Sequence, residues 1–350
     1  MRTGIRVAVI GAGYWGANLI RALHGTDGIW LNLVCDQRPE ALQEVKKRYP
    51  QVALTASWES VLCDHNLDAV VLATPPATHY QLARTALAAG KHTWVEKPLA
   101  LHYREGQELV ALAREADLAL FVDETFLYDP LLQKAKALLA AGAVGAIYHV
   151  SLERTAMGRV RRDSNVWWNS APHDLSILRY LLDIPITRIS AVGHAYVQPG
   201  IEDVVWAALR LDGDVSAHVY LNWLFPEKKA SLVIVGETGM IEYEGRFAQR
   251  ALTRYEYRLG RITPTTAEEI ASANLVPIEH SGVAEVIDGD PSEPLLEACA
   301  AFRDSILRGE LALSSGDRSL PTLAVLEAGA RSLAQQGAWV EVSQGEEGQL

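Results

Sequence analysis

Cysteine is scarce in this chain of 350 residues, and its scarcity argues against one group of structures at the start. Cys35, Cys63 and Cys299 are widely spaced and odd in number, so they suggest neither a disulfide framework nor a zinc-binding pattern. We therefore expect a reducing compartment and no metal site.

Basic residues are also in the minority. The chain has 32 Lys and Arg against 43 Asp and Glu, which gives a net charge of −11 at pH 7. Nucleic-acid binding needs basic patches that neutralise phosphates, so we expect no nucleic-acid partner. The basic run at residues 159–162 (RVRR) is too short to change this. Arg161 or Arg162 could still meet an anionic substrate, although a solvated basic loop explains them equally well.

Long hydrophobic runs are missing as well. No uninterrupted apolar run approaches the ~20 residues that a transmembrane helix needs. The N-terminal MRTGIRVAVIGAG leads directly into a strand, without the layout of a signal peptide. We expect a cytoplasmic protein with no membrane partner, and the chain length suggests two domains.

The first part of the chain, to about residue 125, alternates apolar strand-like segments with helical patterns. Such alternation is typical of parallel βαβ units, and nearly all-apolar strands are typical of a sheet buried on both faces. The expected strands lie within residues 5–13, 31–36, 67–76, 92–98 and 118–126.

After Phe126 the pattern changes to consecutive strand-like segments separated by turns, with helices before, among and after them. This arrangement predicts an α/β domain with a large open, mostly antiparallel sheet over residues 126–342. A surface loop is expected at about 262–293, and a disordered tail at 343–350.

The segment GAGYWG matches G-x-G-x-x-G through Gly11, Gly13 and Gly16. It follows a strand and opens a helix, which is the context of a dinucleotide-binding turn, with the helix N-terminus facing the pyrophosphate. Asp36 ends the second strand, where a carboxylate would hold the adenosine ribose. The alternative is a helix-packing turn with a solvated aspartate. We predict a Rossmann dinucleotide-binding domain over residues 1–125.

Asp36 and Arg38 bear on the choice of cofactor. A carboxylate at position 36 repels the 2′-phosphate of NADP, so we expect NAD. Arg38 favours the opposite choice, although it could equally be solvated or stacked on the adenine. An NADPH-dependent ketosugar reductase therefore remains the second enzyme hypothesis.

Two further strand ends carry polar residues at the expected ligand-binding edge of the sheet. Thr74 and Pro76 follow the third strand, and His79 is either a cofactor contact or simply the start of a helix. EKP follows the fourth strand, near the nicotinamide end of a bound dinucleotide. There Lys97 could stabilise an alkoxide during hydride transfer, whereas a surface ion pair with Glu96 is the alternative.

The segment NVWWNSAPHDLSILRYL contains the other concentration of reactive side chains. Pro172 suits the first turn of a helix, which places His173 and Asp174 at its start. A helix N-terminus lowers the pKa of a histidine and favours a neutral base. The alternative is a capping or core histidine.

Together these segments resemble the glucose-fructose oxidoreductase / inositol dehydrogenase / MocA (Gfo/Idh/MocA) oxidoreductase family. The similarity covers nearly the whole chain, through GAGYWG, ATPP, EKPLA, LLQKAKALLAAGAVGAIYHV and SGDRSLPTLAVLEAGARSL. It implies a cofactor domain joined to an α/β domain whose open sheet forms oligomer contacts. It also implies hydride transfer at a sugar or polyol carbon, and often a cis peptide before the EKP proline.

The resemblance assigns roles at the matching positions. Lys97 is implied to lie beside the substrate and nicotinamide, and His173 to be the general acid/base. Trp168, Pro172, His173 and Asp174 resemble the nucleotide-sugar 3-dehydrogenase subgroup. With Arg38 added from the reasoning above, the residues expected to line the cofactor are Gly11, Ala12, Gly13, Tyr14, Trp15, Gly16, Asp36, Arg38, Thr74, Pro76, His79, Glu96 and Lys97.

Asn169 departs from the family, which usually has an aspartate four residues before the histidine. Asparagine keeps the size and hydrogen bonding but loses the charge, which leaves the substrate open. We expect Trp168, Asn169 and Arg162 to contact a sugar or nucleotide sugar.

We therefore predict an NAD-dependent sugar dehydrogenase or ketoreductase. A non-catalytic dinucleotide-binding regulator is the rival, because the same fold serves both classes. Retention of both Lys97 and His173 favours the enzyme. Trp206, Tyr220 and Trp223 lie on strand-like segments that need cover, so we also expect a homodimer or homotetramer.

Overall fold

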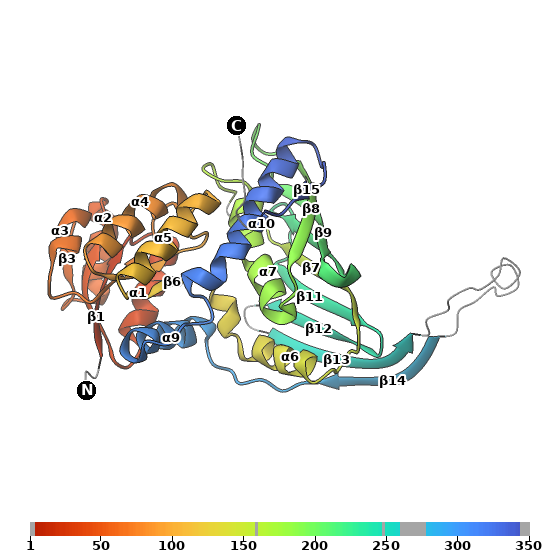
Figure 1. Ribbon diagram of the computed structural model, residues 1–350. Coiled ribbons are helices and arrows are strands. Elements are labelled where there is room, and N and C mark those ends of the chain that lie inside the picture. The colour runs from red at the N-terminus through yellow and green to blue at the C-terminus, as the bar shows by residue number, and fades with distance from the viewer. Residues whose placement is uncertain (1–3, 158–159, 247–248, 260–277, 344–350) are drawn as a thin grey trace, which may run out of the picture. The chain divides into compact units, whose positions relative to one another are not determined.

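The computed structural model describes residues 4–157, 160–246, 249–259 and 278–343 (Figure 1). The chain forms two compact units. Among the described residues, the first comprises the chain up to Asp129 and Ser292–Ala328, and the second Pro130–Pro291 and Gly329–Val342. Residues 292–328, expected from sequence in the second domain, thus belong to the first unit. The predicted tail lies, from residue 344 on, outside the described residues.

The first unit is built on a parallel sheet of six strands in the order β3-β2-β1-β4-β5-β6. This confirms the predicted parallel sheet. Its strand β3 and the neighbouring helix α3 were not predicted, because segments so short show no clear hydrophobic period. The strands are β1 (Ile5–Ile10), β2 (Ile29–Cys35), β3 (Ala53–Thr55), β4 (Ala69–Leu72), β5 (His92–Val95) and β6 (Leu120–Val122).

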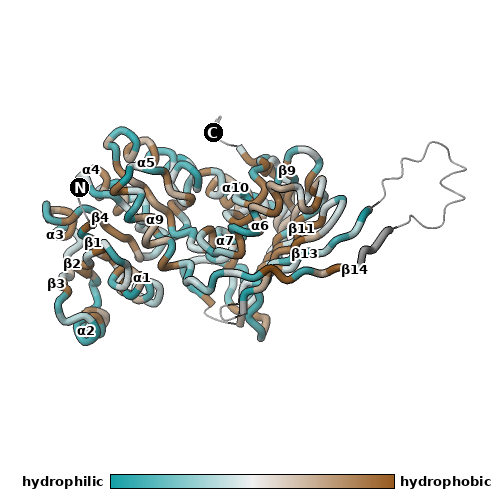
Figure 2. The backbone as a smooth tube through the Cα atoms, turned by 90° about the horizontal axis from the view of Figure 1, so that it is seen from below, coloured by the Kyte–Doolittle hydropathy of each residue, from teal (hydrophilic) through white to brown (hydrophobic). Residues whose placement is uncertain are grey.

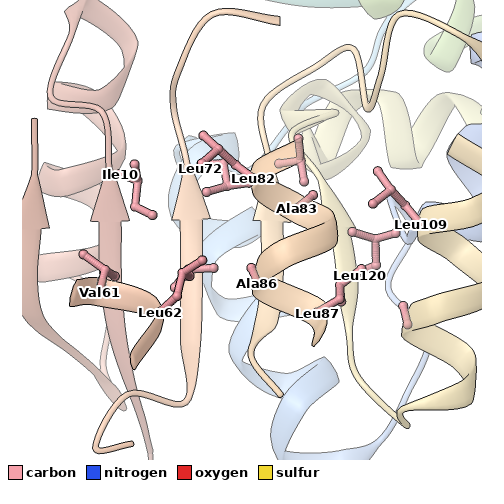
Figure 3. Close-up of a cluster of buried hydrophobic side chains, with 14 of the residues drawn as sticks. Ile10, Val61, Leu62, Leu72, Leu82, Ala83, Ala86, Leu87, Leu109 and Leu120 are labelled. Carbon is pink, nitrogen blue, oxygen red and sulfur yellow. The ribbon is translucent and has the colours of Figure 1, made fainter. Parts of the chain in front are cut away.

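Helices pack on this sheet and bury an apolar cluster. Ile10 and Leu72 from the strands meet Leu82 and Ala83 from α4 and Leu109 from α5 (Figure 3). Helix α2 is hydrophilic along most of its length (Figure 2). The helices are α1 (Tyr14–His24), α2 (Pro39–Arg48), α3 (Trp58–Cys63), α4 (His79–Ala88), α5 (Tyr103–Glu115) and α9 (Pro294–Arg308).

Helix α9 joins the first unit through an aromatic cluster. The ring of Trp94 lies 4.3 Å from that of Phe121 and 5.3 Å from that of Phe302 on α9, measured between centroids. All three side chains are buried, which accounts for the return of this late segment to the first unit.

The second unit contains a sheet of nine strands among its described residues, in the order β14-β13-β12-β11-β7-β10-β9-β8-β15. Only the β7–β10 pair is parallel among the described pairs of this sheet, which confirms the mostly antiparallel prediction. The strands are β7 (Ile147–Thr155), β8 (Ile186–His194), β9 (Val204–Leu211), β10 (Ser216–Asn222), β11 (Lys229–Gly236), β12 (Gly239–Arg246), β13 (Gln249–Leu259), β14 (Ile278–Val286) and β15 (Val340–Glu341).

Strand β14 corrects the later part of the loop predicted at 262–293, because polar residues hid a strand at the edge of the sheet. The earlier part, residues 262–277, lies outside the described residues. Helices α6 (Pro130–Ala140) and α7 (Val166–Leu182) pack on the sheet (Figure 1). Helix α10 (Gly316–Ala334) begins in the first unit and ends in the second. Among the described residues, no helix is both long and apolar enough to cross a membrane.

The other face of the second sheet exposes side chains among the described residues. Along β9 buried and exposed residues alternate, and Trp206 is 46% exposed. Its ring stacks on Tyr220 of β10, with centroids 5.4 Å apart. Trp223 is different, since it follows β10 and is only 7% exposed. The expectation that Trp223 needs an external partner was therefore wrong.

Candidate active site

The glycine turn between β1 and α1 depends on two close backbone contacts. Gly11 has a φ of 101°, and a Cβ there would lie 2.4 Å from the Ala73 oxygen. A Cβ on Gly16 would lie 2.1 Å from the Gly11 oxygen. Gly13 differs, because the atom nearest to a Cβ there would be a guanidinium nitrogen of Arg38, at 3.8 Å. Gly11 and Gly16 therefore shape the turn, and Gly13 leaves room beside it for a ligand.

Asp36, at the end of β2, is held from three sides. One oxygen accepts the Ala12 backbone N–H at 2.7 Å, and the other accepts the Arg38 backbone N–H at 2.9 Å. The Arg38 guanidinium donates to both oxygens, at 3.0 and 2.9 Å. Burial acts to raise the pKa of Asp36, but these hydrogen bonds outweigh it, and the pKa lies below its ordinary value. The carboxylate is therefore ionised and fixed beside the glycine turn.

Arg38 was left open by the sequence, and the structure shows it paired with Asp36 rather than fully solvated. Its side chain is still 60% exposed. A cavity of about 410 Å³ lies beside this pair, between α1 and α2. Four of the predicted cofactor residues line it, namely Ala12, Gly13, Tyr14 and Arg38. The structure thus brings these four together around one concave surface.

His79, at the start of α4, is fully buried. One ring nitrogen lies 2.7 Å from the Pro98 oxygen and the other 2.9 Å from the Thr74 oxygen. Burial, the largest influence, lowers the pKa of this histidine. A buried ring cannot itself touch a ligand, so His79 supports the two turns from behind. Thr74 and Pro76, by contrast, are only half-buried.

Glu96, Lys97 and Pro98 follow β5 at the carboxyl edge of the sheet. The Lys97–Pro98 peptide is cis, as the resemblance implies. Lys97 is half-buried, whereas Glu96 is only 9% exposed. Burial and the neighbouring Asp123 raise the pKa of Glu96 well above its ordinary value, and the positive charge of Lys97 opposes this rise. Lys97 is thus bordered by a largely neutral acid.

The second group of predicted residues lies on α7. This helix begins at Val166, where the Asn165 side chain accepts the Trp168 N–H at 3.1 Å. Pro172 is therefore inside the helix rather than in its first turn, and His173 is not at the N-terminus. The expected helix-dipole effect on His173 was wrong, because the asparagine cap lies seven residues before Pro172.

Asn169 and His173 are four residues apart on α7, so they share one face of the helix. Both are half-buried, as is Trp168. Asp174 is buried and forms a bidentate pair with Arg154 of β7, at 2.9 and 2.8 Å, which fixes the helix on the sheet. Arg162 is exposed, while Arg161 is paired with Asp163 at 2.7 Å.

Asp123 is the residue that the sequence reasoning missed. It is 2% exposed, directly follows β6, and accepts the Trp15 indole N–H at 2.6 Å. The signal was available, because Asp123 ends a strand at the same edge as Glu96. No group of three or more His, Cys, Asp or Glu in the described part of the chain could hold a metal ion.

Comparison with known proteins identifies the class. The family model "Oxidoreductase family, NAD-binding Rossmann fold" matches residues 5–124, and "GFO/IDH/MocA C-terminal domain" matches residues 132–242. Together the two matches cover well over half of the chain. The chain belongs to the Gfo/Idh/MocA family of NAD-binding oxidoreductases.

Among relatives, an uncharacterized oxidoreductase of Escherichia coli K12, YdgJ, is 25% identical over 84% of this chain and 92% of its own length. The scyllo-inositol 2-dehydrogenase (NAD(+)) of Bacillus subtilis is 30% identical over 58% of this chain and 61% of its own. Among solved structures, UDP-N-acetylglucosamine 3-dehydrogenase GnnA from Acidithiobacillus ferrooxidans superposes with a TM-score of 0.79. That match covers 95% of this chain and 98% of the other at 22% identity, which shows a shared fold.

Proposed function

We propose that the protein transfers a hydride between the nicotinamide of NAD and a carbinol carbon of a sugar or nucleotide sugar. The observation that carries this proposal is Lys97, half-buried beside a buried acid at the carboxyl edge of a family-matched Rossmann sheet. A regulator without turnover needs no lysine in such a setting. The Bacillus subtilis relative named as an inositol dehydrogenase supports a polyol or sugar substrate.

The residues have distinct tasks in this reaction. Bound NAD would supply the hydride acceptor for oxidation of the carbinol to a carbonyl. Lys97 stabilises the developing alkoxide with its positive charge, and His173 accepts the hydroxyl proton. Asn169, one turn before His173, offers an amide that can donate to or accept from a sugar hydroxyl. Trp168 and the exposed Arg162 are the proposed substrate contacts nearby in sequence.

NAD fits the residues around the glycine turn better than NADP does. The open space beside Gly13 leaves room for a pyrophosphate, and ionised Asp36 is available to ribose hydroxyls. Asp36 would repel a 2′-phosphate. Arg38 reduces this repulsion because it already pairs with Asp36 and keeps an exposed face. This pairing is the observation that sustains the second candidate, an NADPH-dependent ketosugar reductase.

We also propose that the open face of the second sheet is covered by another copy of this chain. Trp206, Val192 and Tyr196 are all exposed on or beside β8 and β9. Exposed large hydrophobic side chains of this kind mark an association surface. Light scattering should show a dimer or tetramer at micromolar concentration, and a monomer there would contradict this part of the proposal.

The three cysteines are free thiols, as the proposed cytoplasmic location would require.

Mass spectrometry of small molecules released on denaturing the purified protein tests the function. We expect NAD, and with it a sugar or nucleotide sugar whose oxidised and reduced forms can then be assayed with the enzyme. Release of NADP alone would favour the reductase. Bound NAD without turnover of any candidate sugar would favour a regulator.

A further inference from the structure

Two buried carboxyl groups lie side by side next to Lys97. Glu96 follows β5 and Asp123 follows β6, and the preceding residues Val95 and Val122 are paired in the parallel sheet. The Asp123 backbone N–H donates to the Val95 oxygen at 2.8 Å. Glu96 is 9% exposed and Asp123 is 2% exposed. The register of the sheet therefore forces two acids together, away from water.

The surroundings decide which acid is ionised. Asp123 accepts the Trp15 indole N–H at 2.6 Å on one oxygen and the Thr125 hydroxyl on the other. Both donors stabilise a carboxylate. One Glu96 carboxyl oxygen is buried with no hydrogen-bond donor beside it, and Asp123 raises the pKa of Glu96 both through its charge and as a hydrogen-bonding neighbour. Two carboxyl groups can bond to each other only when one of them carries a proton. The proton therefore belongs mainly on Glu96.

We propose that Glu96 and Asp123 share one proton, and that this pair, anchored to the glycine turn by Trp15, positions Lys97 and places one negative charge beside it. Glu96, Asp123 and Trp15 are positioning residues in this proposal. Their effect on turnover rests on the proposed role of Lys97. The existence of the shared proton does not depend on that role.

The other groups near the pair are consistent with one negative charge. Lys97 supplies the positive charge, which acts on both Glu96 and His79. Burial lowers the pKa of His79 and raises the pKa of the Cys299 thiol on α9. The negative charge of Asp123 raises the pKa of Cys299 further. Both of these groups are thus kept neutral, so neither adds a charge beside the acid pair.

The shared proton makes an unusual prediction for amide substitutions. Glu96→Gln leaves Asp123 ionised, and Asp123→Asn leaves Glu96 free to ionise, so each single variant keeps one negative charge. The double variant keeps none. We expect kcat/KM to fall by no more than about threefold in each single variant and by roughly 100-fold or more in the double variant, well beyond the product of the two single losses. Losses that simply multiply, or a double variant with wild-type activity, would overturn the positioning role.

Trp15→Phe tests the anchor while keeping an aromatic ring. Losing the indole donor should raise the proton affinity of the pair and move the pH profile of kcat/KM. NAD affinity should change less than kcat does. An unchanged profile with weakened NAD binding would mean that Trp15 serves the cofactor alone.

Infrared difference spectroscopy of the cofactor-free protein tests the proton without any turnover. At neutral pH we expect the carbonyl band of a protonated carboxylic acid, lost in both Glu96→Gln and Asp123→Asn. Glu108→Gln, a surface variant, should keep the band. A wild-type protein without this band would refute the shared proton, even if the enzyme proved to be an active sugar dehydrogenase. The band in a protein that turns over no sugar would leave the pair standing and refute the proposed function instead.

Discussion

The two candidate groups differ in how they are built. Lys97 has its environment assembled from β5, β6 and α1, whose side chains meet at one edge of a parallel sheet. His173 and Asn169 instead share one face of a single helix, α7. The Arg154–Asp174 pair fixes this helix to the second sheet. The first group is buried and strongly interdependent, and the second is half-buried. Substitutions should therefore interact most strongly around Lys97.

Lys97→Ala should produce the largest effect, because no neighbouring side chain in the acid pair can replace its positive charge. We expect kcat to fall by ~10²–10⁴-fold. NAD affinity should change little, since the glycine turn and Asp36 remain. Steady-state kinetics and fluorescence titration with NAD separate the two quantities. A parallel loss of NAD binding would make Lys97 a cofactor ligand instead.

His173→Ala should lower kcat by a similar or smaller factor, within ~10²–10³-fold. A histidine base gives the pH profile of kcat/KM a limb near neutrality, and this limb should flatten in the variant. Circular dichroism provides the folding control. If the limb survives in a folded variant, another group accepts the proton.

Asn169→Asp tests the face of α7 that carries Asn169 and His173. If the missing charge is unimportant, kcat/KM should stay within roughly fivefold of wild type. If the substrate is anionic, aspartate should raise KM steeply through like-charge repulsion and leave kcat less affected. Assays with a neutral and an anionic sugar distinguish the two outcomes.

Glu96→Gln should change stability in a pH-dependent way that α7 variants do not share. The pKa of Glu96 is raised on folding, so its contribution to stability is complete below about pH 4.3, the ordinary glutamate value, and is lost as pH rises toward the folded-state value. Relative to wild type, the variant should gain about 1.4 kcal/mol per pH unit across that window. Urea unfolding at several pH values measures this. A pH-independent difference would mean that Glu96 ionises normally.

Arg38→Ala should have the smallest effect, since the guanidinium is 60% exposed. Its removal leaves the Asp36 charge unscreened and should sharpen the preference for NAD over NADP by about 1 kcal/mol, roughly fivefold. Titration of both cofactors measures the ratio. A weaker NAD preference would show that Arg38 does not assist the 2′-phosphate.

The comparison also explains what the sequence could predict. Hydrophobic periodicity and the glycine motif were enough for the Rossmann sheet and for the positions of Gly13, Asp36 and Lys97. The start of α7 was missed because Pro172 looks like a first-turn proline, while the true cap is Asn165. The Glu96–Asp123 pair was missed because it exists only through the register of β5 and β6. Local patterns specify elements, whereas contacts between elements depend on the assembled sheet.

The most direct test of the account is the formation of NADH by matched proteins saturated with NAD and given a panel of sugars and nucleotide sugars. We predict that wild-type protein reduces NAD with at least one of them. Lys97→Ala and His173→Ala, folded and NAD-bound, should reduce it at least ~100-fold more slowly. Wild-type rates in both variants would contradict the account.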